Sequence, residues 1–168
     1  MRRVFSFGGR AGAAVRWPVA IAGAILLAGC GAQMIPNTTI ADSPRNREIV
    51  AFCERYRNAL EQRDVGALLA MTSPRYYENS GTPDGTDDYD VTGLREVLRR
   101  ILPRVQTVRY EFRYRRITLE RDLVLVDYTY SGSFRVQTEG GHRWYRRVAD
   151  NRLELEPIGG DFRIVAGM

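Results

Sequence analysis

One carboxylate in the sequence occupies a position that acid–base chemistry could use. Asp127 follows the apolar run Leu123–Val126 and precedes Tyr128. A carboxylate enclosed by apolar side chains has a raised pKa and can act as a general base near neutral pH. The neighbouring phenol can donate a hydrogen bond to a substrate. Asp127 and Tyr128 are therefore the candidate catalytic residues. The alternative is a structural ion pair between Asp127 and an arginine of an adjacent strand.

Other aromatic side chains are candidates for the walls of a ligand pocket. Tyrosine and tryptophan combine an apolar ring with one polar group, which suits them to such walls and equally to an ordinary core. Both hypotheses apply to the five residues Tyr56, Tyr76, Tyr110, Tyr114 and Trp144.

The sequence offers little for metal or cofactor chemistry. It contains one histidine, which excludes sites that need two or more histidine ligands. That residue, His142, follows two glycines and is expected at an exposed turn. Four loop aspartates lack the spacing of an EF-hand, so we expect a solvated loop that caps the next helix. They are Asp84, Asp87, Asp88 and Asp90. We predict no metal and no cofactor.

A cysteine near the N-terminus follows an arginine-rich start and an apolar run. The run Trp17–Gly29 has 13 residues, about 20 Å as a helix, which is too short to span a bilayer comfortably. Together with Cys30, the end of this run (Leu26-Leu27-Ala28-Gly29) resembles the lipobox of bacterial lipoproteins. The resemblance implies cleavage before Cys30 and acylation of its sulfur and new amine. The alternatives are a plain secreted protein and an uncleaved anchor.

This resemblance sets the expected organisation and location of the chain. We expect a signal peptide over 1–29, lipidated Cys30 with a flexible tether over 30–43, and a domain over 44–168. Gly31 favours the outer membrane, facing the periplasm, and the lipid bilayer is then a partner through Cys30. Arg2-Arg3 also resembles a twin-arginine signal, but the ordinary secretory route is the prediction.

The positive charge of the chain lies mostly in its leader. All 25 basic residues are arginine, against 20 acidic ones; residues 1–29 carry +4 of the net +5, leaving +1 from Cys30 onward. This balance argues against a nucleic-acid partner. Five strand arginines could still bind anionic lipid, a cell-wall polymer or an acidic partner, or they form a solvated face neutralised by nearby acids. They are Arg109, Arg113, Arg115, Arg143 and Arg147.

Residues 44–103 show the three- and four-residue spacing of amphipathic helices. Ser43-Pro44 is a favourable helix start, and apolar residues recur through Leu60, which predicts a helix over 44–63. A second helix is expected over 65–72 after Asp64. A third is expected to begin after Asp90 or Thr92 and to end at Pro103. Cys53 lies on the apolar stripe of the first helix and is expected to be a buried thiol.

After residue 104 the period changes to two, which predicts long strands. Apolar and charged residues alternate from Val108 to Tyr114, and the pattern slips at Arg115-Arg116, as at a β-bulge. Further strands are predicted over 123–136, 142–156 and 161–166. Helices followed by an antiparallel meander indicate an α+β fold, with three helices packed on a curved four-stranded sheet.

This order of elements resembles the nuclear transport factor 2-like superfamily, which includes polyketide-cyclase-like proteins. The segment 52–71 is similar to its opening, where an amphipathic helix ends in a short charged turn, and 162–165 is similar to its last strand. The resemblance implies a cone with a pocket between sheet and helices. It does not decide function, because members of this fold include enzymes, binders and assembly modules.

Three functions follow as hypotheses. The first is a membrane-anchored lipoprotein whose domain binds a small ligand or an envelope protein without catalysis. The second is an isomerase, dehydratase or cyclase that uses Asp127 as base. The third is a homodimeric subunit of an envelope assembly, paired through the outer face of the sheet.

Overall fold

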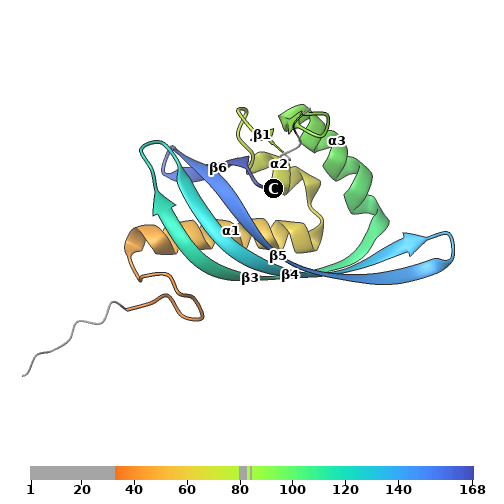
Figure 1. The fold of residues 1–168 in the computed structure, drawn as a ribbon, viewed down its shortest axis with the longest axis horizontal. Coiled ribbons are helices and arrows are strands. Elements are labelled where there is room, and N and C mark those ends of the chain that lie inside the picture. Colours follow the sequence, from red (N-terminus) through yellow and green to blue (C-terminus); the bar gives the residue numbers. More distant parts are fainter. Residues whose placement is uncertain (1–32, 80–82, 84) are drawn as a thin grey trace, which may run out of the picture. The chain divides into compact units, whose positions relative to one another are not determined.

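The computed structural model describes residues 33–79, 83 and 85–168. The predicted leader, Cys30 and Asp84 lie outside these residues. The helices are α1 (Pro44–Gln62), α2 (Val65–Ala70) and α3 (Val91–Ile101), with a 3-10 turn at Leu102–Arg104. The long strands are β3 (Val105–Leu119), β4 (Val124–Thr138), β5 (Gly141–Ile158) and β6 (Asp161–Ala166). Figure 1 shows this predicted α+β architecture. Within the described part of the chain, no helix is long and apolar enough to cross a membrane.

The N-terminal ends of the helices form where the sequence predicts them. The Ser43 hydroxyl accepts a hydrogen bond from the backbone N–H of Asn46, and Pro44 occupies the first turn of α1. Asp64 caps α2 in the same way, and Asp90 caps α3. One element was not predicted: Tyr77–Glu78 (β1) pairs with Tyr89–Asp90 (β2) at the base of the aspartate-rich loop.

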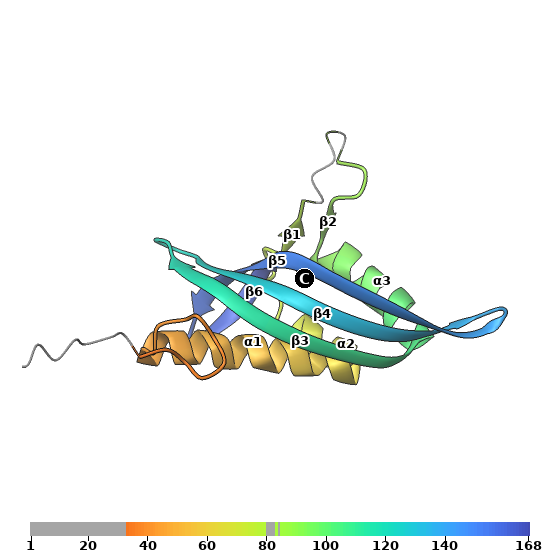
Figure 2. The ribbon, with the colours of Figure 1, turned by 60° about the horizontal axis from the view of Figure 1, so that its bottom comes forward.

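The long strands form one antiparallel sheet in the order β3-β4-β5-β6. The predicted bulge is confirmed, because the pairing of β3 with β4 shifts between Tyr114 and Arg116. The extra residue brings Ile117, rather than Arg116, onto the same face as Tyr114. The helices cover this face, which we call the inner face, and Figure 2 shows them together on one side of the curved sheet. The opposite, outer face is uncovered by any described element.

Residues 33–43 differ from the predicted flexible tether. Met34 pairs with Ala41 in an isolated bridge, and Ile40 is buried in the hydrophobic core at 4% exposure. The Thr39 hydroxyl donates to the backbone carbonyls of Tyr114 and Arg115 at the β3 bulge. The prediction rested on the polar composition of the segment and on Pro36, and it overlooked the apolar side chain of Ile40. Burial of that side chain holds the segment against the domain.

Replacing Ile40 by alanine is expected to lower the free energy of unfolding by about 3 kcal/mol, because it removes buried methylenes and leaves a cavity. Met34→Ala is the matched control, since Met34 is half exposed and should cost little. Urea unfolding of the two variants measures the difference. Equal stabilities would show that the segment is the loose tether predicted from sequence.

Candidate functional site

A cavity of about 170 Å³ lies on the inner face of the sheet, beneath α1. Its walls are mostly aromatic. The ring centroids of Phe112 and Tyr128 lie 4.5 Å apart, and those of Tyr110 and Tyr130 lie 5.7 Å apart. The lining residues come from α1, β3, β4, β5 and the end of the chain: Tyr56, Leu60, Tyr110, Phe112, Tyr128, Tyr130, Asn151 and Met168.

Strand register places these side chains together. Phe112 is paired with Tyr130, and Tyr128 is paired with Asn151, so their side chains share the inner face. Gly132 stands opposite Tyr110 and leaves room for its ring. A Cβ atom at Gly132 would lie 2.7 Å from the ring of Phe134 and 3.1 Å from that of Tyr110. The glycine therefore allows aromatic rings to pack over the strand.

The hydroxyls around the cavity fall into two groups. The Asn151 side-chain amide donates to the Tyr128 hydroxyl and to the Gly167 carbonyl, both at 3.1 Å. The hydroxyls of Tyr56, Tyr110 and Tyr130 have no hydrogen-bond partner among the described residues. Because no fully buried side-chain N or O atom in this part of the chain lacks a partner, these three hydroxyls contact open space. They are available to a ligand or to water.

Burial favours the neutral form of three phenols on the cavity wall, those of Tyr56, Tyr110 and Tyr128. It raises the pKa of Tyr56 and Tyr128 well above the usual range, and that of Tyr110 to about 12. At pH 7 these phenols, the Asn151 amide and the apolar walls are all uncharged. The cavity therefore offers hydrogen bonds and ring stacking to a ligand.

Two of the five predicted pocket residues line the cavity, namely Tyr56 and Tyr110. The predicted catalytic residue Tyr128 lines it as well. Tyr76 and Tyr114 are buried beside it and donate hydrogen bonds to carboxylates: Tyr76 to Glu78 and Tyr114 to Glu54, each at 2.7 Å. These two are structural parts of the core.

Trp144 was wrongly predicted as a pocket residue. It pairs with Arg135 in the register of β4 and β5, so its side chain is on the outer face, and it is 58% exposed. Asn151, in contrast, was missed. Counting two residues at a time back from the apolar Leu153 and Leu155 would have placed it on the inner face.

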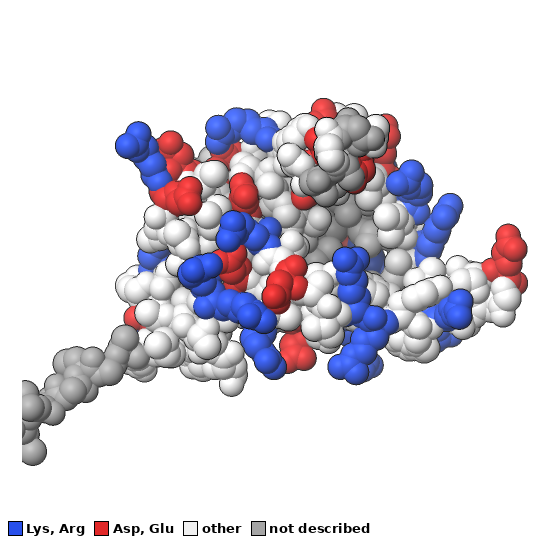
Figure 3. All heavy atoms as spheres, viewed as in Figure 1, with Lys and Arg blue, Asp and Glu red and all other residues white. Residues whose placement is uncertain are grey.

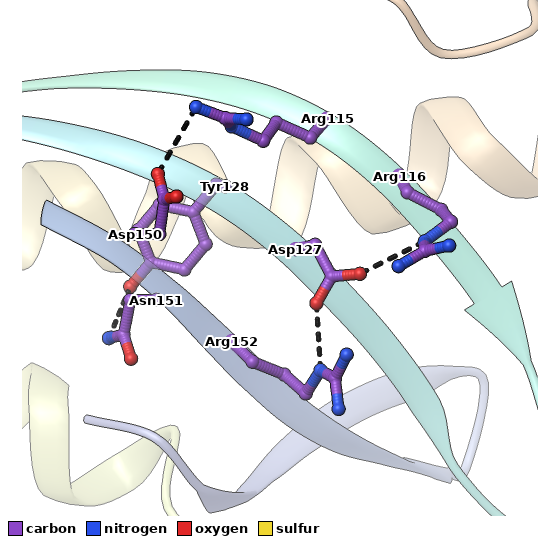
Figure 4. A pocket seen from close by; sticks show the side chains of 7 residues that line it. All are labelled: Arg115, Arg116, Asp127, Tyr128, Asp150, Asn151 and Arg152. Carbon is purple, nitrogen blue, oxygen red and sulfur yellow. Dashed lines mark hydrogen bonds and ion pairs between the residues drawn. The ribbon is translucent and has the colours of Figure 1, made fainter.

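Asp127 does not enter the cavity, so its predicted role as a pocket base is wrong. It lies on the outer face, where Arg116 Nε and Arg152 Nε donate to its two oxygens at 3.1 and 2.7 Å (Figure 4). The hydrogen bond from Arg152, followed by that from Arg116, lowers the pKa of Asp127. This is the structural ion pair that the sequence allowed as the alternative.

The outer face around Asp127 forms an open depression of about 690 Å³. Each of its charged side chains is ion-paired: Arg116 and Arg152 pair with Asp127, and Arg115 pairs with Asp150 at 3.2 Å. Thr129 bridges Arg115 and Asp150. The aspartate-rich loop is also locally bonded: Asp90 caps α3, and Asp88 accepts from the Tyr77 hydroxyl. His142 is exposed next to the β4–β5 turn, as expected.

Comparison with solved structures identifies the fold. The chain is similar to a candidate dehydratase of the nuclear transport factor 2-like family from Streptomyces avermitilis, with 8% identity, TM-score 0.60, and coverage of 73% of this chain and 92% of the other. A candidate aromatic ring hydroxylase from Novosphingobium aromaticivorans matches with 15% identity, TM-score 0.62, and coverage of 75% and 89%.

A ketosteroid isomerase-like protein from Erwinia carotovora atroseptica matches with 16% identity, TM-score 0.59, and coverage of 75% and 95%. Sequence identities this low say nothing about activity, but the structural likeness establishes the predicted nuclear transport factor 2-like fold. No protein-family model and no curated protein matches the sequence.

Asp127→Asn is expected to lower the free energy of unfolding by about 1 kcal/mol at pH 7, because it removes the charge that two partly exposed arginines share. The pKa of Asp127 is about 3.9 in the unfolded chain and lower in the folded protein. The ion pair therefore stabilises the fold fully above the unfolded-state pKa, and this stabilisation is lost as the pH falls through the folded-state pKa. The stability difference from wild type should therefore begin to shrink near pH 4 and close only below the folded pKa, which urea unfolding at a series of pH values measures. A difference that is absent at pH 7, or that does not shrink as the pH falls from 5 to 3, would contradict the ion-pair assignment.

Proposed function

We propose that this protein is a lipid-anchored component of the bacterial cell envelope whose inner-face cavity binds a small ligand without catalysing its conversion. The observation that carries the binding role is the set of three unpartnered tyrosine hydroxyls around an apolar, uncharged cavity. A general base must accept a proton near neutral pH, and a phenol that carries its proton does not do so. Such phenols can donate hydrogen bonds and stack on a ring.

The size of the cavity limits the ligand. A space of about 170 Å³ is close to an engineered cavity of about 150 Å³ that holds benzene. We infer a compact molecule with one ring or its aliphatic equivalent. An oxygen acceptor on the ligand, such as a carbonyl, would pair with the hydroxyl of Tyr56, Tyr110 or Tyr130. An apolar body would pack against Phe112 and Leu60.

An enzyme of isomerase or dehydratase type is the second candidate, favoured by the names of two structural neighbours. It would need a base other than Asp127. Glu54 is connected to the cavity wall through Tyr114, whose ring packs against Phe112 with centroids 6.3 Å apart. The same carboxylate, however, pairs with Arg57 at 2.8 Å. That ion pair and the hydrogen bond from Tyr114 give the Glu54 carboxylate a structural role on α1.

The anchor part of the proposal rests on the lipobox-like sequence that ends at Cys30. Two residues separate Cys30 from Gln33, the first described residue. Since residues 33–43 pack against the domain, an acylated Cys30 would hold the domain close to the bilayer surface. Gly31 favours placement in the outer membrane, facing the periplasm.

Tyr56→Phe is expected to weaken binding of acetophenone about three- to tenfold, because the carbonyl loses one hydrogen bond. Ethylbenzene lacks the carbonyl, and its binding should be unchanged. Chemical-shift titration of the full chain measures both. Tyr114→Phe is the matched control: it should cost about 1 kcal/mol of stability through loss of the bond to Glu54, whereas Tyr56→Phe should cost little. If neither probe binds, or if Tyr56→Phe weakens both equally, the ligand proposal fails.

Cys30→Ser is expected to abolish incorporation of labelled palmitate and to keep the chain as an uncleaved precursor in its native cells. Cys53→Ser is the control, because burial raises the pKa of this thiol and shields it from modification. Labelling followed by detergent-phase partition measures the outcome. Palmitate incorporation that persists in the Cys30 variant would rule out the anchor.

A further inference from the structure

The distal parts of β4 and β5, residues 133–148, form a hairpin that we call the arm. Figures 1 and 2 show it extending beyond the helices, at the opposite end of the sheet from residues 33–43. β6 pairs with β5 only from Glu154 onward, so this part of β5 is an edge. On the other side of the arm, β3 pairs with β4 as far as Val136, so only the tip, residues 137–142, projects as two strands. The β5 side chains of residues 142–148 are exposed on both faces.

The arm carries unneutralised positive charge. It contains four arginines and one acidic residue, Glu139, and none of the four arginines forms an ion pair with a described residue. The arginines are Arg135, Arg143, Arg146 and Arg147. Nearer the middle of the sheet the pattern differs, because Arg115, Arg116 and Arg152 are each paired with an aspartate. Figure 3 shows arginine side chains gathered along one part of the sheet and over α3.

Large apolar and aromatic side chains are exposed among these charges. Trp144 is 58% exposed, Tyr145 46% and Val148 61%. The Arg143 guanidinium lies 5.9 Å from the centre of the Tyr145 ring. Alternation along the strand places Trp144 and Val148 on the outer face and Tyr145 on the inner face. Charged side chains alone would protect this edge strand from pairing, so two exposed aromatic residues among the arginines are more than solubility requires.

We propose that the arm docks onto the headgroup region of an anionic lipid bilayer. On the outer face, the guanidiniums of Arg135 and Arg146 pair with lipid phosphates, while the ring of Trp144 and the side chain of Val148 enter the interfacial layer, which tyrosine and tryptophan favour. Arg143 and Arg147, on the opposite face, add to the positive charge of the arm. Nucleic acid would meet the same charges but gains nothing from exposed Val148. This inference goes beyond the proposed function. If Cys30 is acylated as proposed, the arm supplies a second contact at the other end of the sheet, and the domain lies along the membrane.

The two tryptophans of the chain, Trp17 and Trp144, allow a direct test. In the full chain with Trp17→Phe, the fluorescence comes from Trp144 alone. On vesicles that contain phosphatidylglycerol, we expect a blue shift and quenching by brominated lipid. On pure phosphatidylcholine vesicles we expect neither. Added salt should reverse the signal, because screening weakens contacts with the anionic surface.

The triple variant Arg135→Gln, Arg143→Gln, Arg146→Gln removes the two arginines on the face of Trp144 and the one that precedes it in the chain. It should weaken this signal more than about tenfold, since each basic residue near an anionic surface contributes to binding. The matched control makes the same change at three exposed arginines of α3: Arg95→Gln, Arg99→Gln and Arg100→Gln. It loses the same net charge and should keep the signal. Unchanged melting temperatures confirm that both variants fold.

Several results would overturn the proposal. Equal quenching on neutral vesicles would assign the contact to the apolar effect alone, and equal loss in both triple variants would assign it to net charge. A Trp144 shift that depends on protein concentration without lipid would show a second copy at the free edge. Quenching by single-stranded RNA without any response to anionic vesicles would identify a nucleic-acid surface instead.

Discussion

The packing of the inner face of the sheet depends on whether each buried tyrosine hydroxyl has a hydrogen-bond partner. Burying a phenol adds apolar area to the core but removes its hydroxyl from water, which is costly without a partner. The core supplies partners for Tyr76, Tyr114 and Tyr128 from Glu78, Glu54 and Asn151. The hydroxyls of Tyr56, Tyr110 and Tyr130, three residues that line the cavity, have no partner among the described residues and are not fully buried. The cavity is thus the place where the core leaves hydrogen-bonding capacity unused, and a polar occupant would complete it.

The two faces of the sheet carry different kinds of side chain. Because side chains alternate, Tyr128 and Asp127 are neighbours in sequence yet lie on opposite faces. The inner face gathers neutral rings, whereas the outer face gathers arginines and carboxylates that pair with one another around Asp127. The ion pairing ends at the arm, where none of the four arginines forms an ion pair with a described residue. The cavity and the arm are therefore the two features that point to other molecules.

Much of the fold could be predicted from the sequence. Helix starts followed from Ser43 and Asp64, and the one-residue slip at Arg115 predicted the bulge. The face that Asp127 occupies was not predictable from local alternation. Residues 123–126 are all apolar, so the sequence does not show whether the odd-numbered or the even-numbered side chains of this strand face the helices. The core position of Ile40 was also hidden, since a single apolar residue in a polar segment has no periodicity. These features are set by tertiary packing rather than by local pattern.

A high-resolution crystal structure of the protein purified from its native cells would test the central claim most directly. We predict density in the cavity, from a small molecule or ordered water, within hydrogen-bond distance of the Tyr56, Tyr110 and Tyr130 hydroxyls. A collapsed cavity, in which these hydroxyls bond to other protein groups, would contradict the account and leave the domain without a ligand site on its inner face.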